Sequence, residues 1–154
     1  MIENFVLDEE LFMPDIDIST QFKLFEEMGN ILKQKGYVTD DYTEAITKRE
    51  KQYPTGLVTN TYEVAIPHVD AKYAKVNTLY VLTSKNGVKF ENSEEDGHIN
   101  AKIVMGIILK DHNSHIDCLV KVSKVLQNDK LLHDIYCAKD RKQLKNLIEQ
   151  SLFK

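Results

Sequence analysis

The chain has 154 residues, enough for one domain with a sizeable core and short for two, so a single domain spanning 1–154 is expected. Acidic residues number 24 against 20 basic ones, and the formal net charge of −4 provides no general attraction for nucleic acid. The start, MIENFVLDEE, lacks the basic residues and apolar run of an export signal, and no apolar stretch is long enough to span a membrane. A cytoplasmic protein without direct membrane insertion is expected.

Two amphipathic helices are predicted in the first third of the chain. Across 19–35, five apolar residues recur at the spacing of one helix face, and a glycine then ends the pattern. A second helix is predicted to begin at Asp41, whose side chain can cap it while Glu44 reaches back, and to end before Pro54. Arg49 then lies near the C-terminal end of this second helix.

The middle of the chain predicts strands and turns. A loop is expected over 55–63, followed by a short strand at 64–66. The apolar run 79–82 lacks alternation, which is typical of a strand buried on both faces. Asn86-Gly87 is a strong turn signal and predicts that 88–90 returns as a hairpin partner. Beyond an acidic loop, 103–109 is the best candidate for a central strand.

Three helices are predicted at the end of the chain, over 114–127, 129–137 and 140–152. Ser114 with Asp117, and Asp140 with Gln143, have the spacing of capping boxes. Helices therefore precede and follow a group of strands. This order favours an α/β (α+β) fold, with a mixed β-sheet flanked by helices on both faces.

The two cysteines, Cys118 and Cys137, fall outside any CxxC or zinc-type spacing. Each lies within a predicted amphipathic helix, so both are expected to be buried, reduced thiols.

His68 is the first candidate for a functional residue. A histidine at the end of a strand is usually only a surface or hydrogen-bonded side chain. The preceding Pro67 changes this expectation, because proline cannot donate to a sheet ladder and fixes its own φ. It ends the strand and presents His68 at the rim of the sheet, where open α/β sheets place their sites.

His115 and Arg49 have side chains that suit an anionic ligand. If Ser114 caps the third-last helix, His115 takes the first helical position, beside unpaired N–H groups that attract phosphate. The alternative is an exposed first-turn residue without a task. Arg49 offers a fork of donors that matches phosphoryl oxygens if it reaches His68. A surface ion pair with neighbouring carboxylates is the alternative for Arg49.

Metal and cofactor chemistry find little support in the sequence. His112 and His115 have a spacing that can bring two imidazoles together, but His112 is expected to precede the helix cap and no third ligand has a recognisable spacing. The chain also lacks a P-loop, a dinucleotide-binding glycine motif, a nucleophile elbow and a zinc-protease motif. Neither a metal nor a cofactor is therefore expected.

Three short elements follow one another in a fixed order: Arg49-Glu50, then Pro54-Thr55-Gly56-Leu57, then Ala65-Ile66-Pro67-His68. In this order they resemble the mannitol/fructose-type enzyme IIA superfamily of the bacterial phosphotransferase sugar-uptake system. The linker 58–63 departs from the glycine-rich linker of the fructose branch and is more similar to the galactitol branch. Later blocks at 88–90, at the strand ending in Leu109 and at 115–119 keep the family order, so the resemblance covers most of the chain.

The resemblance implies the mannitol/fructose-type enzyme IIA fold and a phosphocarrier function. Phospho-HPr would donate a phosphoryl group to His68, and a cysteine of enzyme IIB, coupled to membrane enzyme IIC, would accept it. The resemblance also implies that His115 and Arg49 assist the transfer. The chemistry suits these residues, because an imidazole nitrogen is nucleophilic at neutral pH and forms a reactive phosphoramidate without a metal.

The surface around His68 must then dock two proteins in turn, and Leu57, Tyr62, Val69 and Tyr73 are candidates for it, with core packing as the alternative for each. The resemblance further implies that the membrane component selects the transported sugar, galactitol or a related one, so this sequence does not identify it.

Two other functions remain open. One is a regulatory enzyme IIA-like module; a fused regulator would carry further domains, so a free-standing uptake component is expected. The other is a small hydrolase or metal-binding protein that uses His68, His112 and His115.

Overall fold

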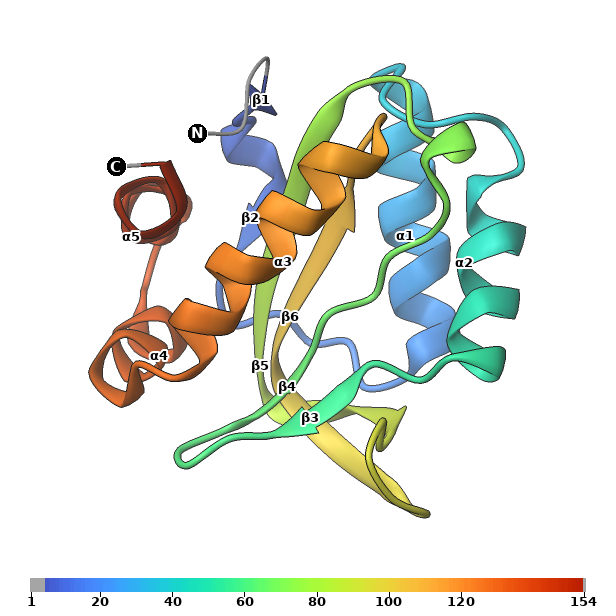
Figure 1. Ribbon diagram of the computed structural model, residues 1–154. Helices are drawn as coiled ribbons and strands as arrows, with labels where there is room; N and C mark the ends of the chain where they lie inside the picture. Colours follow the sequence, from blue (N-terminus) through green and yellow to red (C-terminus); the bar gives the residue numbers. More distant parts are fainter. Residues whose placement is uncertain (1–4, 154) are drawn as a thin grey trace.

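The computed structural model describes residues 5–153, and its centre is a six-stranded mixed sheet (Figure 1). The strands are β1 (Phe5–Val6), β2 (Phe12–Met13), β3 (Gly56–Val58), β4 (Glu63–Ala65), β5 (Asn77–Glu91) and β6 (His98–Ile108). Their order is β1-β5-β6-β4-β3, and β2 also pairs with β5. The β5–β6 and β3–β4 pairs are antiparallel and the others are parallel, so the predicted mixed sheet is confirmed.

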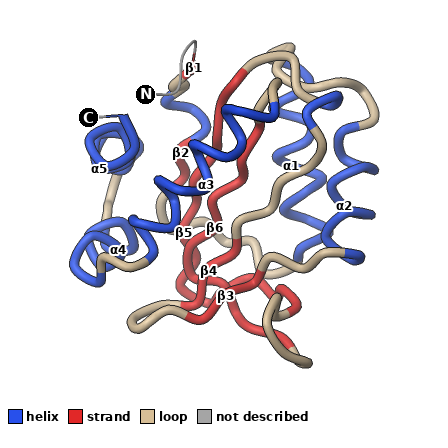
Figure 2. The backbone as a smooth tube through the Cα atoms, viewed as in Figure 1, coloured by secondary structure: helices blue, strands red, loops and turns tan. Residues whose placement is uncertain are grey.

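Helices cover both faces of this sheet, as predicted (Figure 2). They are α1 (Gln21–Gln34), α2 (Tyr42–Gln52), α3 (His112–Leu126), α4 (Asp129–Cys137) and α5 (Arg141–Phe153), with short 3-10 turns η1 (Glu9–Leu11) and η2 (Ala71–Tyr73). Alternate residues of β5 enter two separate cores: Leu79 and Val81 pack with α3–α5, whereas Tyr80 and Leu82 pack with α1 and α2. This confirms a strand buried on both faces.

The hairpin predicted at Asn86-Gly87 is wrong. β5 runs through this position to Glu91, and the register with β6 shifts between Thr83 and Val88, as in a β-bulge. Gly87 has φ of 80°, and a Cβ there would lie 2.8 Å from the Cβ of Asn100. Glycine is thus required for a bulge in a long strand, where positive φ is as useful as in a tight turn. The real β5–β6 connection is the acidic segment 92–97.

Smaller predictions also differ from the structure. Strands β1, β2 and β3 were not predicted, because each has only two or three residues and depends on distant pairing. Asp41 precedes α2 but does not cap it, and its carboxylate instead accepts a hydrogen bond from Thr39. Asp140 does accept from the Gln143 N–H, as expected of a cap. Cys118 is buried as predicted, whereas Cys137 is exposed, which corrects that prediction.

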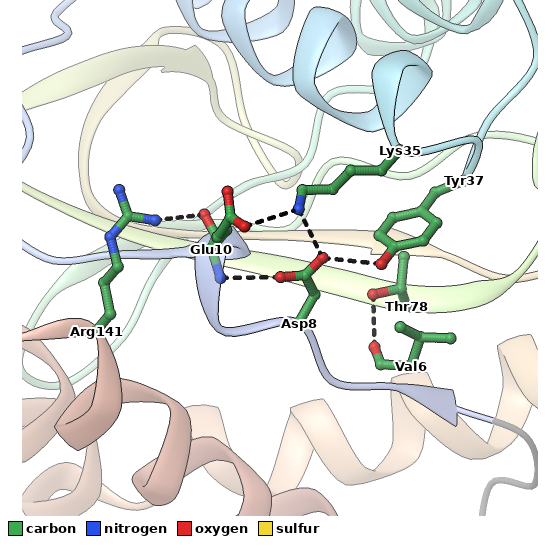
Figure 3. A network of polar contacts seen from close by, with 7 residues as sticks. All are labelled: Val6, Asp8, Glu10, Lys35, Tyr37, Thr78 and Arg141. Carbon is green, nitrogen blue, oxygen red and sulfur yellow. Dashed lines mark hydrogen bonds and ion pairs between the residues drawn. The ribbon is translucent and has the colours of Figure 1, made fainter.

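A polar network attaches the N-terminal segment to both helical layers (Figure 3). The Asp8 carboxylate accepts hydrogen bonds from Lys35, which follows α1, and from the Tyr37 hydroxyl, at 2.9 and 2.8 Å. Arg141 at the start of α5 donates to the Glu10 carbonyl at 2.7 Å. Burial alone raises the pKa of Asp8, but the hydrogen bonds from Lys35 and Tyr37 outweigh it and lower this pKa below its ordinary value.

The expected domain includes residues 1–4 and 154, which lie outside the described residues. Within 5–153, no helix combines the length and apolar character needed to cross a membrane.

Candidate functional site

His68 lies just beyond the C-terminal end of β4, an inner strand that pairs with β6 on one side and β3 on the other. Pro67 cannot donate, but its carbonyl accepts from the Ile107 N–H at 3.0 Å, so the chain continues beside β6 after the strand has ended. The half-buried imidazole is held by its Nδ1, 2.8 Å from the Ile66 carbonyl. A carbonyl can only accept, so Nδ1 carries the proton and Nε2 keeps its lone pair. This arrangement leaves the Nε2 lone pair of His68 available to an electrophile.

His115 faces His68, with the two ring centroids 5.7 Å apart and the rings inclined by 62°. The predicted start of its helix is wrong by three residues. Asp111 is the cap of α3, and its carboxylate accepts from both the N–H and the hydroxyl of Ser114, at 2.7 and 2.9 Å. His115 is therefore the fourth helical residue, and His112 takes the first position.

The environment of His115 favours the neutral form of its ring. Burial is the main cause that lowers the pKa of His115; the neighbouring His68, His112 and Arg49 act in the same direction, and Asp70 acts against them. Its Nε2 is buried and has no hydrogen-bond partner among the described residues. A neutral imidazole with an unused ring nitrogen can offer one hydrogen bond to a ligand held at His68.

Arg49 comes to the same place from the last turn of α2. Its guanidinium lies 3.4 Å from Asp70 and stacks over the Tyr53 ring, 4.5 Å from the ring centroid. Arg49 and the two histidines line one cavity of about 310 Å³. The structure thus brings the three candidate residues together, and it shows that Arg49 does have the surface ion pair considered as its alternative.

Two further residues line this cavity: His112, which was considered only for the alternative hydrolase or metal-binding function, and Asp70, which was not predicted. Recognising Asp111 and Ser114 as cap and third residue of a helix would have placed His112 beside His115. Asp70 follows His68 by two residues, but only the fold brings it to Arg49. Within 5–153, no group of three His, Cys, Asp or Glu side chains is arranged to hold a metal ion.

An apolar surface adjoins the cavity on α3. Ile116 and Val120 are about half exposed, and with Leu119 they line a groove that continues from the cavity. Two of the residues proposed for docking are poorly placed for it: Val69 lines the cavity but is buried in the α1–α2 core, and Tyr62 lies elsewhere, hydrogen-bonded to His133 at 2.7 Å. The exposed face of α3 is therefore the better candidate for docking a protein.

Comparisons with known proteins give one consistent result. The family model described as "Phosphoenolpyruvate-dependent sugar phosphotransferase system, EIIA 2" matches residues 5–151. The galactitol-specific EIIA component of Escherichia coli K12 is 29% identical over 97 residues, which span 63% of this chain and 65% of that protein. The mannitol-specific enzyme IIA component of Staphylococcus aureus N315 is 29% identical over 151 residues, covering 92% of this chain and 97% of that protein.

The fold comparison agrees with the sequence comparison. The structure of the complex of enzyme IIAMTL and phosphorylated enzyme IIBMTL from Escherichia coli contains a chain that superposes with a TM-score of 0.76 at 23% identity. The superposition covers 95% of this chain and 99% of that one. The predicted mannitol-type enzyme IIA fold is thereby confirmed.

Proposed function

We propose that this chain, which belongs to the type 2 EIIA family of the phosphoenolpyruvate-dependent sugar phosphotransferase system, is a cytoplasmic phosphocarrier that accepts a phosphoryl group on His68. In this proposal the chain acts as one phosphotransferase domain, with phospho-HPr as donor and a cysteine of enzyme IIB as acceptor. The observation that carries the proposal is the fixed His68 ring, whose Nδ1 is engaged by the Ile66 carbonyl and whose Nε2 retains its lone pair.

This geometry supports the following transfer. Nε2 of His68 attacks the phosphorus of the donor phosphohistidine, a new P–N bond forms, and the donor P–N bond breaks with its electron pair returning to the donor ring. The His68 ring gains positive charge as it reacts, and the Ile66 carbonyl stabilises that charge through Nδ1–H. The second transfer moves the phosphoryl group from Nε2 to a thiolate of enzyme IIB.

Arg49 and His115 serve the phosphoryl oxygens. Both line the cavity with His68, and Arg49 supplies a permanent positive charge while His115 supplies a neutral hydrogen bond. Asp70 holds Arg49 while no phosphoryl group is present. An incoming phosphoryl group competes with Asp70 for the guanidinium, so Arg49 need not be ordered anew at each transfer.

The partners are proteins, and the surface next to the cavity suits them. Ile116, which lines the cavity with His68, and Val120, in the adjoining groove, expose apolar side chains, as expected of a face that must bind and release two proteins in turn. The relatives with named sugars support galactitol or a related polyol as the transported compound.

The decisive experiment is phosphorylation of the full chain with labelled phosphoenolpyruvate, enzyme I and HPr. The protein should acquire a label that survives base and is lost in acid, and His68→Ala should abolish it. His98→Ala is the matched control, because His98 is an exposed histidine that does not line the cavity. An unlabelled wild-type chain, or a label that persists in His68→Ala, would refute the proposal.

A further inference from the structure

Glu50 is a buried carboxyl group to which the transfer mechanism gives no task. It lies on the last turn of α2 next to Arg49, and only 2% of its surface is exposed. None of the ion pairs within 5–153 includes Glu50. Such a burial is costly without compensation, so the contacts that Glu50 does make indicate why it is there.

Both oxygens of Glu50 are occupied by one residue, Thr55. Oε2 accepts from the Thr55 N–H at 2.6 Å, and Oε1 lies 2.8 Å from the Thr55 hydroxyl. Thr55 is itself buried, and β3 begins at the next residue. Glu50 therefore attaches the end of α2 to the first residue ahead of β3.

A chain of hydrogen bonds continues from Thr55 to His68. The Thr55 carbonyl accepts from the Ile66 N–H at 3.4 Å, as an extension of the antiparallel β3–β4 pairing. The carbonyl of the same Ile66 accepts from Nδ1–H of His68 at 2.8 Å. Ile66 is thus held on one side by Thr55 and holds the imidazole on the other.

The two buried tyrosines near Glu50 do not offer a competing role, and neither Lys51 nor Lys89, which line a cavity with Glu50, forms an ion pair with it among the described residues. The hydroxyls of Tyr42 and Tyr80 are buried, and the charge of Glu50 raises the pKa of Tyr80, after burial and Tyr42. Neither tyrosine hydrogen-bonds Glu50 within the described residues. The two hydrogen bonds from Thr55 are therefore the contacts through which the carboxyl group of Glu50 acts on the structure.

We propose that Glu50 is a positioning residue for the phosphoryl acceptor. Through Thr55 and Ile66 it holds the carbonyl that fixes His68 in the Nδ1–H tautomer, with Nε2 free for attack. The expected effect of Glu50 on the transfer rate rests on the proposed function. Its expected effect on the tautomer of His68 rests on the hydrogen bonds alone.

Two substitutions of Glu50 separate the effect of its hydrogen bonds from the effects of its charge and its volume. In Glu50→Gln, the amide oxygen can accept from the Thr55 N–H and the amide nitrogen can donate to the hydroxyl, so the relay persists without the charge. Glu50→Leu has similar volume and can do neither. Ile46→Val, one turn earlier on α2 and fully buried, is the control for a general loosening of the helix.

The readout is the tautomer of His68, measured from the ring ¹⁵N shifts of the full chain at a pH where the ring is neutral, together with the single-turnover rate from phospho-HPr. Wild type, Glu50→Gln and Ile46→Val should show the Nδ1–H tautomer, and Glu50→Leu a mixture of tautomers. The rate should fall about tenfold in Glu50→Leu and stay within about twofold of wild type in the other two.

An unchanged tautomer and rate in a folded Glu50→Leu would overturn the proposal, and so would equal losses in Glu50→Gln and Glu50→Leu. If Glu50→Leu does not fold, Glu50→Met replaces it, since its unbranched side chain removes both carboxylate oxygens that contact Thr55; an unchanged tautomer there would again overturn the relay. A wild-type chain that takes no phosphoryl group refutes the proposed function instead, and the tautomer measurement still decides the role of Glu50.

Discussion

The buried Glu50 should give the protein a stability that falls as the pH rises, and Glu50→Gln should remove this dependence. Burial raises the pKa of Glu50 from 4.5 to about 7, against the two hydrogen bonds from Thr55, which lower it. In the unfolded chain the carboxyl group titrates near 4.5, so between these values the folded chain binds the proton more tightly. Stability from this group is therefore complete below about 4.5 and lost as the pH rises toward 7.

The size of the effect follows from the two pKa values. Each tenfold difference in proton affinity corresponds to 1.36 kcal/mol, so the interval from 4.5 to about 7 corresponds to roughly 3 kcal/mol. Glu50 is 2% exposed, so solvent screening reduces this value little. Glutamine resembles the protonated acid, so Glu50→Gln should match wild type near pH 4.5 and exceed it above pH 7.

Urea unfolding of both proteins from pH 4.5 to 8 measures this difference directly. Subtracting one free energy of unfolding from the other cancels the other titrating groups, including Asp8. Glu44→Gln, which neutralises an exposed carboxyl group on the same helix, is the control and should run parallel to wild type. Parallel curves for wild type and Glu50→Gln would refute the argument, since Glu50 would then titrate alike in both states.

Three further outcomes follow from the site and the N-terminal network. His115→Ala should slow transfer from phospho-HPr by about 100-fold, while the affinity of the variant for HPr should change little. Single-turnover rates at varied HPr concentration measure both quantities, and an unchanged rate would contradict the role of His115. The double variant Ile116→Asp and Val120→Asp should weaken HPr binding, measured by titration, by about tenfold or more. The control Phe22→Asp changes another exposed apolar residue and should leave the affinity unchanged; equal effects would show that α3 does not form the docking surface. Asp8→Asn should lower the free energy of unfolding by about 1 kcal/mol at pH 7 and by less near pH 3. The pKa of Asp8 is lowered in the folded chain, so the stability that its carboxylate contributes is lost as the pH falls; an equal loss of stability at both pH values would contradict the pairing with Lys35.

Local chemistry explains which parts of the fold could be predicted. The apolar face of α1, the buried run in β5 and the cap of α5 depend on neighbours within a few residues, and all three were correct. Asn86-Gly87 failed because a bulge and a tight turn need the same positive φ at glycine. The choice between them is made by β6, which pairs with both halves of β5.

The start of α3 shows a similar limit at the site. Asp111 and Ser114 are both good caps, and two caps three residues apart give the same local signal. A cap at Ser114 would give His115 the first helical position, whereas the observed cap at Asp111 gives that position to His112. In the structure His112 is exposed and His115 is half-buried. Pro67 beside His68 was informative because its effect on the strand is local, whereas the Glu50–Thr55–Ile66 contacts needed the β3–β4 pairing.

The charges around His68 suit a group that must be released as well as bound. Among the described residues that line the cavity, Arg49 is the one permanent cation, and Asp70 already neutralises part of its charge. Burial lowers the pKa of His115 and so favours its neutral form, which adds a hydrogen bond without a second full charge. Two full positive charges would stabilise the phosphorylated ring strongly and raise the barrier for the transfer to enzyme IIB, because only preferential stabilisation of the transition state accelerates transfer. A site with one shared cation and one neutral donor is therefore better matched to a carrier than to an enzyme that keeps its phosphoryl group.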